Sequence, residues 1–443
     1  MRNFIQRNPL ATAVSALATL TGLLVSAPSQ AVSISQDGLG QVLLYPYYTV
    51  EGGYDTGVSV LNSTDQPKAV SVRFRDAQNG RGNIVFKLYL APHDMWTAAI
   101  TTTGGGGKLI TADKSCTWPK IPASGVEFGE FGGLASEGSF EVIELGVVTS
   151  AAVAAQVTPG ASCDLQGIDM AASAGATALA PPSGGLTGSA TLINVSGGAE
   201  YSYEPVVLDG FSTANLWSAE GPDLRAATPK VSQVLDKGRA ITSTWSKGED
   251  AVSALLMRAS LRNDFVLEPT TNSGTDWVVG MPTKHYYVNT DNPAAPSFSA
   301  PFGKASFTAD ICEYYDPESA LQWNREGNSY IPIHFGARQP WESALCGETS
   351  VLTFENSNVL GSTQSVNQDA YYDWQGNGFV NGWMEIAFDQ DAQRLVSLEG
   401  HVYQGLPVTG FMVHDFVNGN VGGLLSNYGG NFEHKYTTVI ETP

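Results

Sequence analysis

The chain has 443 residues and a formal net charge of -20 at pH 7, from 43 Asp and Glu against 23 Lys and Arg. This balance argues against a nucleic-acid partner, because phosphate binding needs a basic surface. Charged residues make up only 15% of the chain and 48 residues are glycine, a composition that suits exported β-structure solubilised by hydroxyl and amide groups as well as by charge.

The first 31 residues have the layout of a secretory signal peptide. Arg2 and Arg7 supply a positive start, and the apolar run at 10–25 is shorter than a membrane span requires. Ser29 and Ala31 are the small residues that a signal peptidase reads. We therefore predict a signal peptide at 1–31 followed by a secreted chain, with a retained membrane anchor as the weaker alternative.

Four cysteines follow the signal segment. In an exported chain an even number of cysteines predicts disulfides, and four cysteines allow three connectivities. Pairing of nearest neighbours would close two local loops, each worth about 4 kcal/mol in the chain-entropy model. Metal binding is the weaker alternative, because no CxxC or Cys-His cluster is present. The candidate disulfide residues are Cys116, Cys163, Cys312 and Cys346.

The stretch from Gly40 to Ile100 has the clearest strand pattern. Short runs with period-two alternation are separated by turn-forming clusters of Gly, Asn, Asp and Pro. Within one run, Val70, Val72 and Phe74 alternate with polar residues, which predicts one face toward a core and one toward water. This spacing is typical of an antiparallel β-sandwich, either immunoglobulin-like or jelly-roll-like.

The first strand of that stretch, 42–50, contains Pro46, which cannot donate to a central ladder. We expect this strand at a sheet edge or next to a bulge. Three tyrosines flank the proline: Tyr45, Tyr47 and Tyr48. They either fill the rim of the core or form an assembly edge to which a neighbouring molecule adds a strand.

The pattern changes between 223 and 262. The segments 229–238 and 247–262 contain good helix formers, and Gly248-Glu249-Asp250 gives the second one an acidic start. We predict a β-rich domain at 32–222, a short helical connector at 223–262 and a second β-rich domain at 263–443.

An oxygen-rich loop in the second half resembles part of a calcium loop. Its candidate ligands are Asp369, Asp373, Gln375 and Asn377. An EF-hand is not supported, because Met384 stands where the last carboxylate should be. A calcium site of another kind stays open, so Ca²⁺ is the one cofactor considered.

Aromatic residues gather around the same loop. Exposed Trp and Tyr rings are typical stacking platforms for sugars. The candidate stacking residues are Tyr371, Tyr372, Trp374 and Trp383, joined by Tyr314, Tyr315 and Trp323.

Catalytic motifs are missing from the sequence. There is no GxSxG or HExxH motif, and the six histidines have no recognised ligand spacing. His93 and Asp94 are adjacent, so on a strand they would point to opposite faces. We therefore do not expect an enzyme.

Several segments together resemble a known family of exported proteobacterial proteins, described as cell-surface or hypothetical proteins. They are Gly38–Thr49, Val72–Phe74, Leu88–Ile100, Thr275–Lys284 and the region from Gly405–Pro407 to Asn427–Gly429. The resemblance implies secretion to the surface of a Gram-negative bacterium. The family has no established activity, so no catalytic residue is carried over.

An acidic, β-rich, disulfide-tied exported chain without catalytic motifs fits a structural protein. We expect it to self-assemble, as a homo-oligomer or lattice, into a surface layer, sheath or filament. The alternative is a surface adhesin or carbohydrate-binding module that uses exposed Trp and Tyr. The expected partners are therefore other copies, the outer-membrane surface or glycans, and no nucleic acid.

Overall fold

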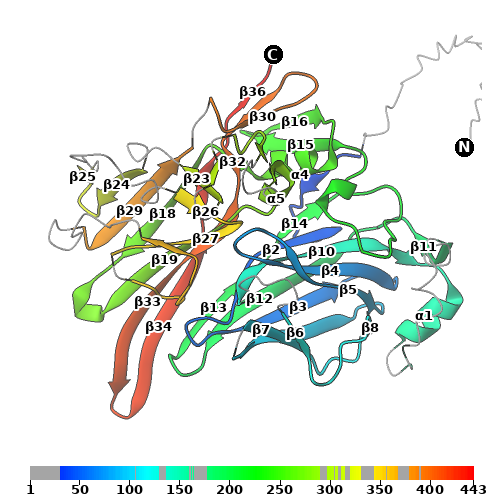
Figure 1. Ribbon diagram of the computed structural model, residues 1–443, viewed down its shortest axis with the longest axis horizontal. Helices are drawn as coiled ribbons and strands as arrows, with labels where there is room; N and C mark the ends of the chain where they lie inside the picture. Colours follow the sequence, from blue (N-terminus) through cyan, green and yellow to red (C-terminus); the bar gives the residue numbers. More distant parts are fainter. Residues whose placement is uncertain are drawn as a thin grey trace, which may run out of the picture.

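The computed structural model describes residues 30–104, 106–128, 136–158, 161, 163, 177–289, 297–303, 305–307, 311–314, 320–330, 344–355, 357–367, 379–388 and 391–443. The chain is mainly β with several antiparallel sheets, as the sequence predicts. Figure 1 shows two strand-rich bodies side by side, the N-terminal one in blue to green and the C-terminal one in light green to red.

Two sheets form the N-terminal sandwich. The first has the order β1-β14-β2-β10-β4-β5-β8, with β11 also paired to β10, and the second has the order β13-β12-β3-β6-β7-β9. The first comprises β1 (Ser33–Ile34), β2 (Val42–Thr49), β4 (Lys68–Asp76), β5 (Gly82–Leu90), β8 (Cys116–Trp118), β10 (Glu137–Val148), β11 (Leu179–Ala180) and β14 (Val206–Asp209). The second comprises β3 (Asp55–Asn62), β6 (Met95–Thr103), β7 (Gly106–Ile110), β9 (Val126–Glu127), β12 (Leu186–Asn194) and β13 (Ala199–Tyr203). A short helix, α1 (Ala151–Val157), follows β10.

Strand β4 shows where the alternation holds and where it does not. Val70, Val72 and Phe74 are fully buried between the two sheets, as predicted. The other face was expected in water, yet Arg75 is only 7% exposed and pairs with Glu141 at 3.0 Å. Later segments of the chain cover that face, so its arginines, Arg73 and Arg75, are paired with Glu141 rather than solvated.

The connector region is only partly helical. Helix α4 (Gly248–Leu256) lies within the predicted 247–262 segment, and its acidic first turn is as expected. The predicted helix at 229–238 is wrong, because β15 (Val231–Asp236) and β16 (Arg239–Thr244) form an antiparallel hairpin there. Gln233 and Leu235 are exposed while Ser232 and Val234 are buried, so the segment follows a period of two rather than of 3.6. The short turn η1 (Leu224–Ala226) precedes this hairpin.

The C-terminal sandwich also has two main sheets, with orders β25-β24-β29-β18-β35 and β28-β27-β19-β33-β34. The first comprises β18 (Ser260–Val266), β24 (Ala320–Asn324), β25 (Ser329–Tyr330), β29 (Asn381–Ala387) and β35 (Lys435–Thr437). The second comprises β19 (Ser273–Gly280), β27 (Thr349–Thr353), β28 (Ser365–Asn367), β33 (Thr409–Val421) and β34 (Leu424–Glu433).

Smaller elements close the ends of this sandwich. They are β17 (Met257–Arg258) with β32 (Leu406–Pro407), β20 (Val288–Asn289) with β21 (Ser297–Phe298), β22 (Ala305–Phe307) with β23 (Ile311–Tyr314) and β26 (Ala344–Cys346), and β30 (Arg394–Val396) with β31 (Val402–Gln404) and β36 (Ile440–Glu441). Two short helical turns, η2 (Pro269–Thr271) and α5 (Lys284–Tyr287), flank β19.

The two sandwiches share their apolar packing. Sheet β28-β27-β19-β33-β34 buries Trp277 and Met412 against the other C-terminal sheet, and its opposite face buries Val278 and Phe411 against the N-terminal sandwich. Phe411 stacks on Tyr203 of β13 with ring centroids 4.6 Å apart. The two faces of this one sheet therefore belong to two hydrophobic cores, one within the C-terminal sandwich and one shared with the N-terminal sandwich. Among the described residues no helix is long and apolar enough to cross a membrane.

Candidate functional site

The three tyrosines predicted at an assembly edge lie in the interior. Tyr45 is 1% exposed, and Tyr47 and Tyr48 are 0% exposed. Strand β2 lies between β14 and β10, and its ladder with β10 shifts register around Pro46, which therefore sits at a bulge. The bulge alternative is confirmed and the exposed edge is wrong, because β14, from much later in the chain, pairs with the residues before the proline.

Tyr47 instead takes part in a buried polar contact between the sandwiches. Its hydroxyl donates to Glu137 Oε2 at 2.7 Å, and Glu137 is 0% exposed. Ser362 and Thr363 of the C-terminal half donate three more hydrogen bonds to the same carboxylate, at 2.6 to 2.8 Å. Four donors satisfy this buried acid, so it holds the two bodies together without a cation.

The cysteines pair as nearest neighbours. Cys116 bonds Cys163 and Cys312 bonds Cys346, so each bridge stays within one half of the chain. The candidate calcium ligands Asp369, Asp373, Gln375 and Asn377 lie outside the described residues. No cluster of three or more acidic, His or Cys side chains that could hold a metal ion occurs in the part of the chain that the structure describes.

Of the aromatic stacking candidates, Tyr371, Tyr372, Trp374 and Tyr315 lie outside the described residues, as does the side chain of Tyr314. Trp383 and Trp323 face each other across β29 and β24. Their rings stack with centroids 3.9 Å apart and an angle of 11°. Trp383 is 38% exposed, so this pair presents an aromatic surface on the outside of its sheet.

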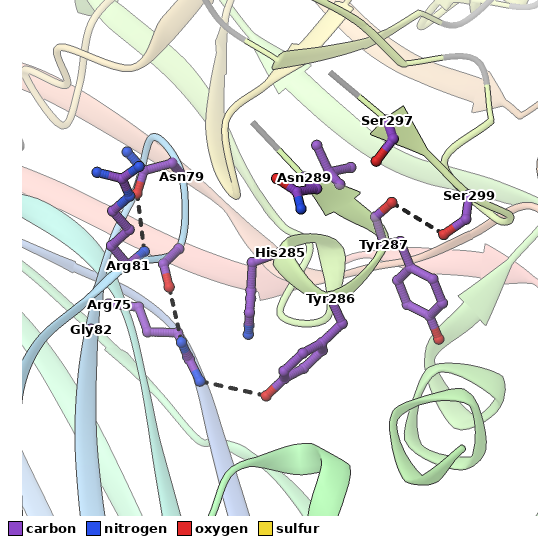
Figure 2. Close-up of a pocket in the computed structure, with 12 residues that line it drawn as sticks. Arg75, Asn79, Arg81, Gly82, His285, Tyr286, Tyr287, Asn289, Ser297 and Ser299 are labelled. Atoms are coloured by element: carbon purple, nitrogen blue, oxygen red, sulfur yellow. Dashed lines mark hydrogen bonds between the residues drawn. The ribbon is translucent and has the colours of Figure 1, made fainter. Parts of the chain in front are cut away.

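A cleft of about 630 Å³ opens between the two sandwiches. Figure 2 shows the turn between β4 and β5, with Asn79 and Arg81, on one side and Tyr286, Asn289 and Ser297 on the other. At its floor, Arg75 donates to the carbonyl oxygen of Gly80 at 2.9 Å. The cleft is thus lined by hydrogen-bonding groups from both halves of the chain.

Two ionisable groups of this cleft, His285 and Arg75, are paired with buried carboxylates. His285 Nδ1 lies 2.8 Å from both oxygens of Glu348, which is 1% exposed. The other ring nitrogen, Nε2, is sealed from solvent and has no partner among the described residues. Burial opposes the charge of Arg75, but the attraction of Glu141, together with smaller contributions from Tyr286 and Glu348, raises the Arg75 pKa. The pairs of His285 with Glu348 and of Arg75 with Glu141 therefore serve the packing of the two sandwiches.

A second feature is the long hairpin of β33 and β34, which reaches the lower edge of the molecule in Figure 1. Strand β19 pairs with β33 only as far as Phe416, so the rest of the hairpin has no further neighbour in its own sheet. One side of β34 packs on β13, where Asn431 Nδ2 donates to the Ser202 carbonyl oxygen and Tyr201 lies against Gly429. The opposite side faces outward.

We call that outward side the hairpin face. Leu424 is 73%, Tyr428 66% and Phe432 51% exposed, and alternation places all three on the same side of β34. From β33, His414 lies between Phe416 and Phe432, with ring centroids 5.2 and 5.4 Å away. The hairpin face consists of His414, Phe416, Val421, Leu424, Tyr428 and Phe432.

The hairpin face carries no charge. Residues 416–432 contain no Asp, Glu, Lys or Arg, although the whole chain has a net charge of -20. Burial lowers the pKa of His414, which keeps that ring neutral near pH 7. Contiguous exposed apolar patches on soluble proteins usually mark a contact surface. The hairpin face therefore has the chemistry of an interaction surface.

Comparison with known protein families, characterised proteins and solved structures gives no match. The functional conclusion accordingly depends on the chain's own residues. The sequence analysis did not single out the hairpin face, but the uncharged run at 416–432 is the signal that points to it. Glu137 and Glu348 carry no such signal, because only the packing of distant segments makes them partners.

Proposed function

We propose that this chain is an exported structural protein of the cell surface that self-associates through the hairpin face. The observation that carries the proposal is the contiguous exposure of Leu424, Tyr428 and Phe432 on an uncharged strand. Burial of each such side chain contributes roughly 1.5 to 3 kcal/mol, and the sum over two hairpin faces is set against the entropic cost of association.

The uncharged hairpin face is the part of the surface where a second copy meets the least electrostatic repulsion. Two molecules of net charge -20 repel each other over most of their surfaces, and the repulsion is smallest where both present an uncharged patch. A two-fold contact of hairpin face on hairpin face brings neutral, apolar surfaces together. The two disulfides are compatible with an extracellular location, which supports the same proposal.

The test is association measured by sedimentation velocity and by electron microscopy of the purified protein. The triple variant Leu424→Ser, Tyr428→Ser, Phe432→Ser should remain monomeric at concentrations where the unmodified protein forms dimers or larger assemblies. The matched control replaces Met95, Val396 and Leu398 by Ser, three apolar residues that are 51%, 55% and 68% exposed elsewhere on the surface. An unmodified protein that stays monomeric at every concentration, or a control that dissociates equally, would refute the proposal.

A second candidate function is carbohydrate binding, favoured by the stacked Trp323 and Trp383. Sugar rings stack on exposed indole faces, and Trp383 offers one. A glycan array with the unmodified protein and with Trp383→Ala tests it. Saturable sugar binding that this variant loses would support the second function, and no binding by the unmodified protein would remove it.

A further inference from the structure

A second cleft, also about 630 Å³, lies between the sandwiches on the side of β17 and β35. The N-terminal half contributes Ser189, Ser202 and Glu204 to its wall, and the C-terminal half contributes Arg258 and Tyr436. Arg258 is 7% exposed, whereas Tyr436 is 53% exposed. A cation is therefore almost completely buried at the wall of an open cleft.

Arg258 is held in a fixed orientation. Its Nη1 donates to the carbonyl oxygens of Leu255 and Met257, both at 2.9 Å, at the C-terminal end of α4. The guanidinium carbon lies 3.9 Å from the centre of the Tyr436 ring, a cation–π contact that helps to hold the guanidinium in place. These contacts leave one edge of the guanidinium, formed by Nε and Nη2, without a hydrogen-bond acceptor among the described residues.

That edge has no partner among the described residues, and neither nitrogen is sealed from solvent. No carboxylate in the described part of the chain forms an ion pair with Arg258, and burial lowers its pKa. A buried cation without a counter-charge is costly unless an anion binds it. The carbonyl oxygens of Leu255 and Met257 offset only part of that cost.

The shape of the free edge selects the kind of anion. Arg225 shows the geometry in this same chain, because its Nε donates to Oδ1 of Asp223 at 3.1 Å and its Nη2 donates to Oδ2 at 2.6 Å. A planar carboxylate fits such a fork with two parallel hydrogen bonds. The serine hydroxyls of the opposite wall already bond neighbouring hydroxyls, Ser189 with Ser59 and Ser202 with Thr191, and each oxygen keeps a lone pair that can accept from a ligand's hydroxyl group.

We propose that the cleft between Arg258, Tyr436 and Ser202 binds a carboxylate-bearing sugar, with the carboxylate on Nε and Nη2 of Arg258. Glu204 and Glu433, two exposed carboxylates that also line the cleft, disfavour a second negative charge on the ligand. The site therefore selects a single carboxylate accompanied by hydroxyls. It is separate from the hairpin face and does not depend on self-association.

The test is calorimetric titration of the purified protein with galacturonate and glucuronate at low ionic strength. Glucose and galactose are the neutral matched sugars, and acetate is the carboxylate without hydroxyls. The expected result is saturable binding of at least one uronate, with weaker binding of acetate and none of the neutral sugars. Arg258→Gln should weaken the binding about tenfold or more, the loss expected for a pair of charge-assisted hydrogen bonds.

Two further variants leave the Arg258 contacts to α4 in place and decide the matter if Arg258→Gln does not fold. Glu204→Gln removes a negative charge from the rim and should tighten uronate binding by a few-fold. Ser189→Trp fills the cleft and should abolish binding. The proposal is overturned if the unmodified protein binds no uronate, if a folded Arg258→Gln binds as well as the unmodified protein, or if Ser189→Trp leaves the affinity unchanged.

Discussion

Replacing Asp276 by Asn should stabilise the protein, increasingly so as the pH rises. Asp276 lies on β19, on the face that packs against the N-terminal sandwich, and is 0% exposed. Its Oδ2 accepts the Leu360 amide hydrogen at 2.9 Å, while Oδ1 has no partner among the described residues. Burial, with a smaller contribution from the nearby Asp415, raises the pKa of Asp276 to about 7.

The size of the stabilisation follows from the pKa of Asp276 in the unfolded and in the folded protein. The ordinary value is 3.8 and the folded value about 7, and at about 1.4 kcal/mol per pKa unit the gap corresponds to about 4 kcal/mol. Because the folded state holds the proton more tightly than the unfolded chain, folding stability falls as the pH rises between these values. Above about pH 8 the full cost of about 4 kcal/mol is present, and the neutral amide of Asp276→Asn avoids it.

The assay is urea unfolding followed by tryptophan fluorescence at pH values from 5 to 9. At pH 5, about 1.2 pH units above the ordinary pKa, roughly 1.7 kcal/mol of this cost is already present, and the advantage of Asp276→Asn should grow to about 4 kcal/mol by pH 8 and then level off. Other titrating groups occur in both proteins and cancel in the difference. Asp209→Asn, an exposed aspartate of β14, is the matched control for the replacement of an aspartate by asparagine. A pH-independent difference for Asp276→Asn would refute the reasoning.

Two other predictions concern the joints of the molecule. Glu137→Ala should lower the free energy of unfolding by about 3 to 5 kcal/mol in chemical denaturation, because it leaves buried donors from both sandwiches unpaired. Glu137→Gln keeps an acceptor and should lower it by less. Equal losses for the two variants would argue against this account. Replacing both cysteines of the Cys312–Cys346 bridge by Ser should lower the free energy of unfolding by about 4 kcal/mol, the loop-closure value for a separation of 34 residues. An unfolding midpoint equal to that of the unmodified, oxidised protein would contradict this prediction.

The period-two pattern of the N-terminal half predicted its strands because it depends only on which residues are apolar. Val70, Val72 and Phe74 lie on the buried side of β4, as that pattern requires. The pattern does not say what covers the other side. Arg75 was expected in water, but Glu141 and Tyr286, from distant parts of the chain, surround it. Partners of this kind are set by tertiary packing, which no local window contains.

The errors have the same origin. Pro46 cannot take part in a regular central ladder, so the sequence allows either a bulge or an edge strand at this position. Only the pairing of β14 with β2, which the local sequence does not contain, shows that it is a bulge. The segment 229–238 has acceptable helix formers, yet the turn at Lys237-Gly238, with both residues at positive φ, closes a hairpin there. The uncharged run that contains most of the hairpin face is visible in the sequence. The exposure of its side chains could not be predicted, because apolar residues of strands are usually buried.

The disulfide connectivity has a consequence for how the protein matures. Each bridge joins cysteines that are consecutive in the chain, and the two loops neither overlap nor interlock. A chain that enters an oxidising compartment N-terminus first would present Cys116 and Cys163 before either of the other two thiols. An oxidant that simply joins thiols in order of arrival would then produce the native pattern. Correct oxidation of this chain should therefore need no enzyme that reshuffles disulfides.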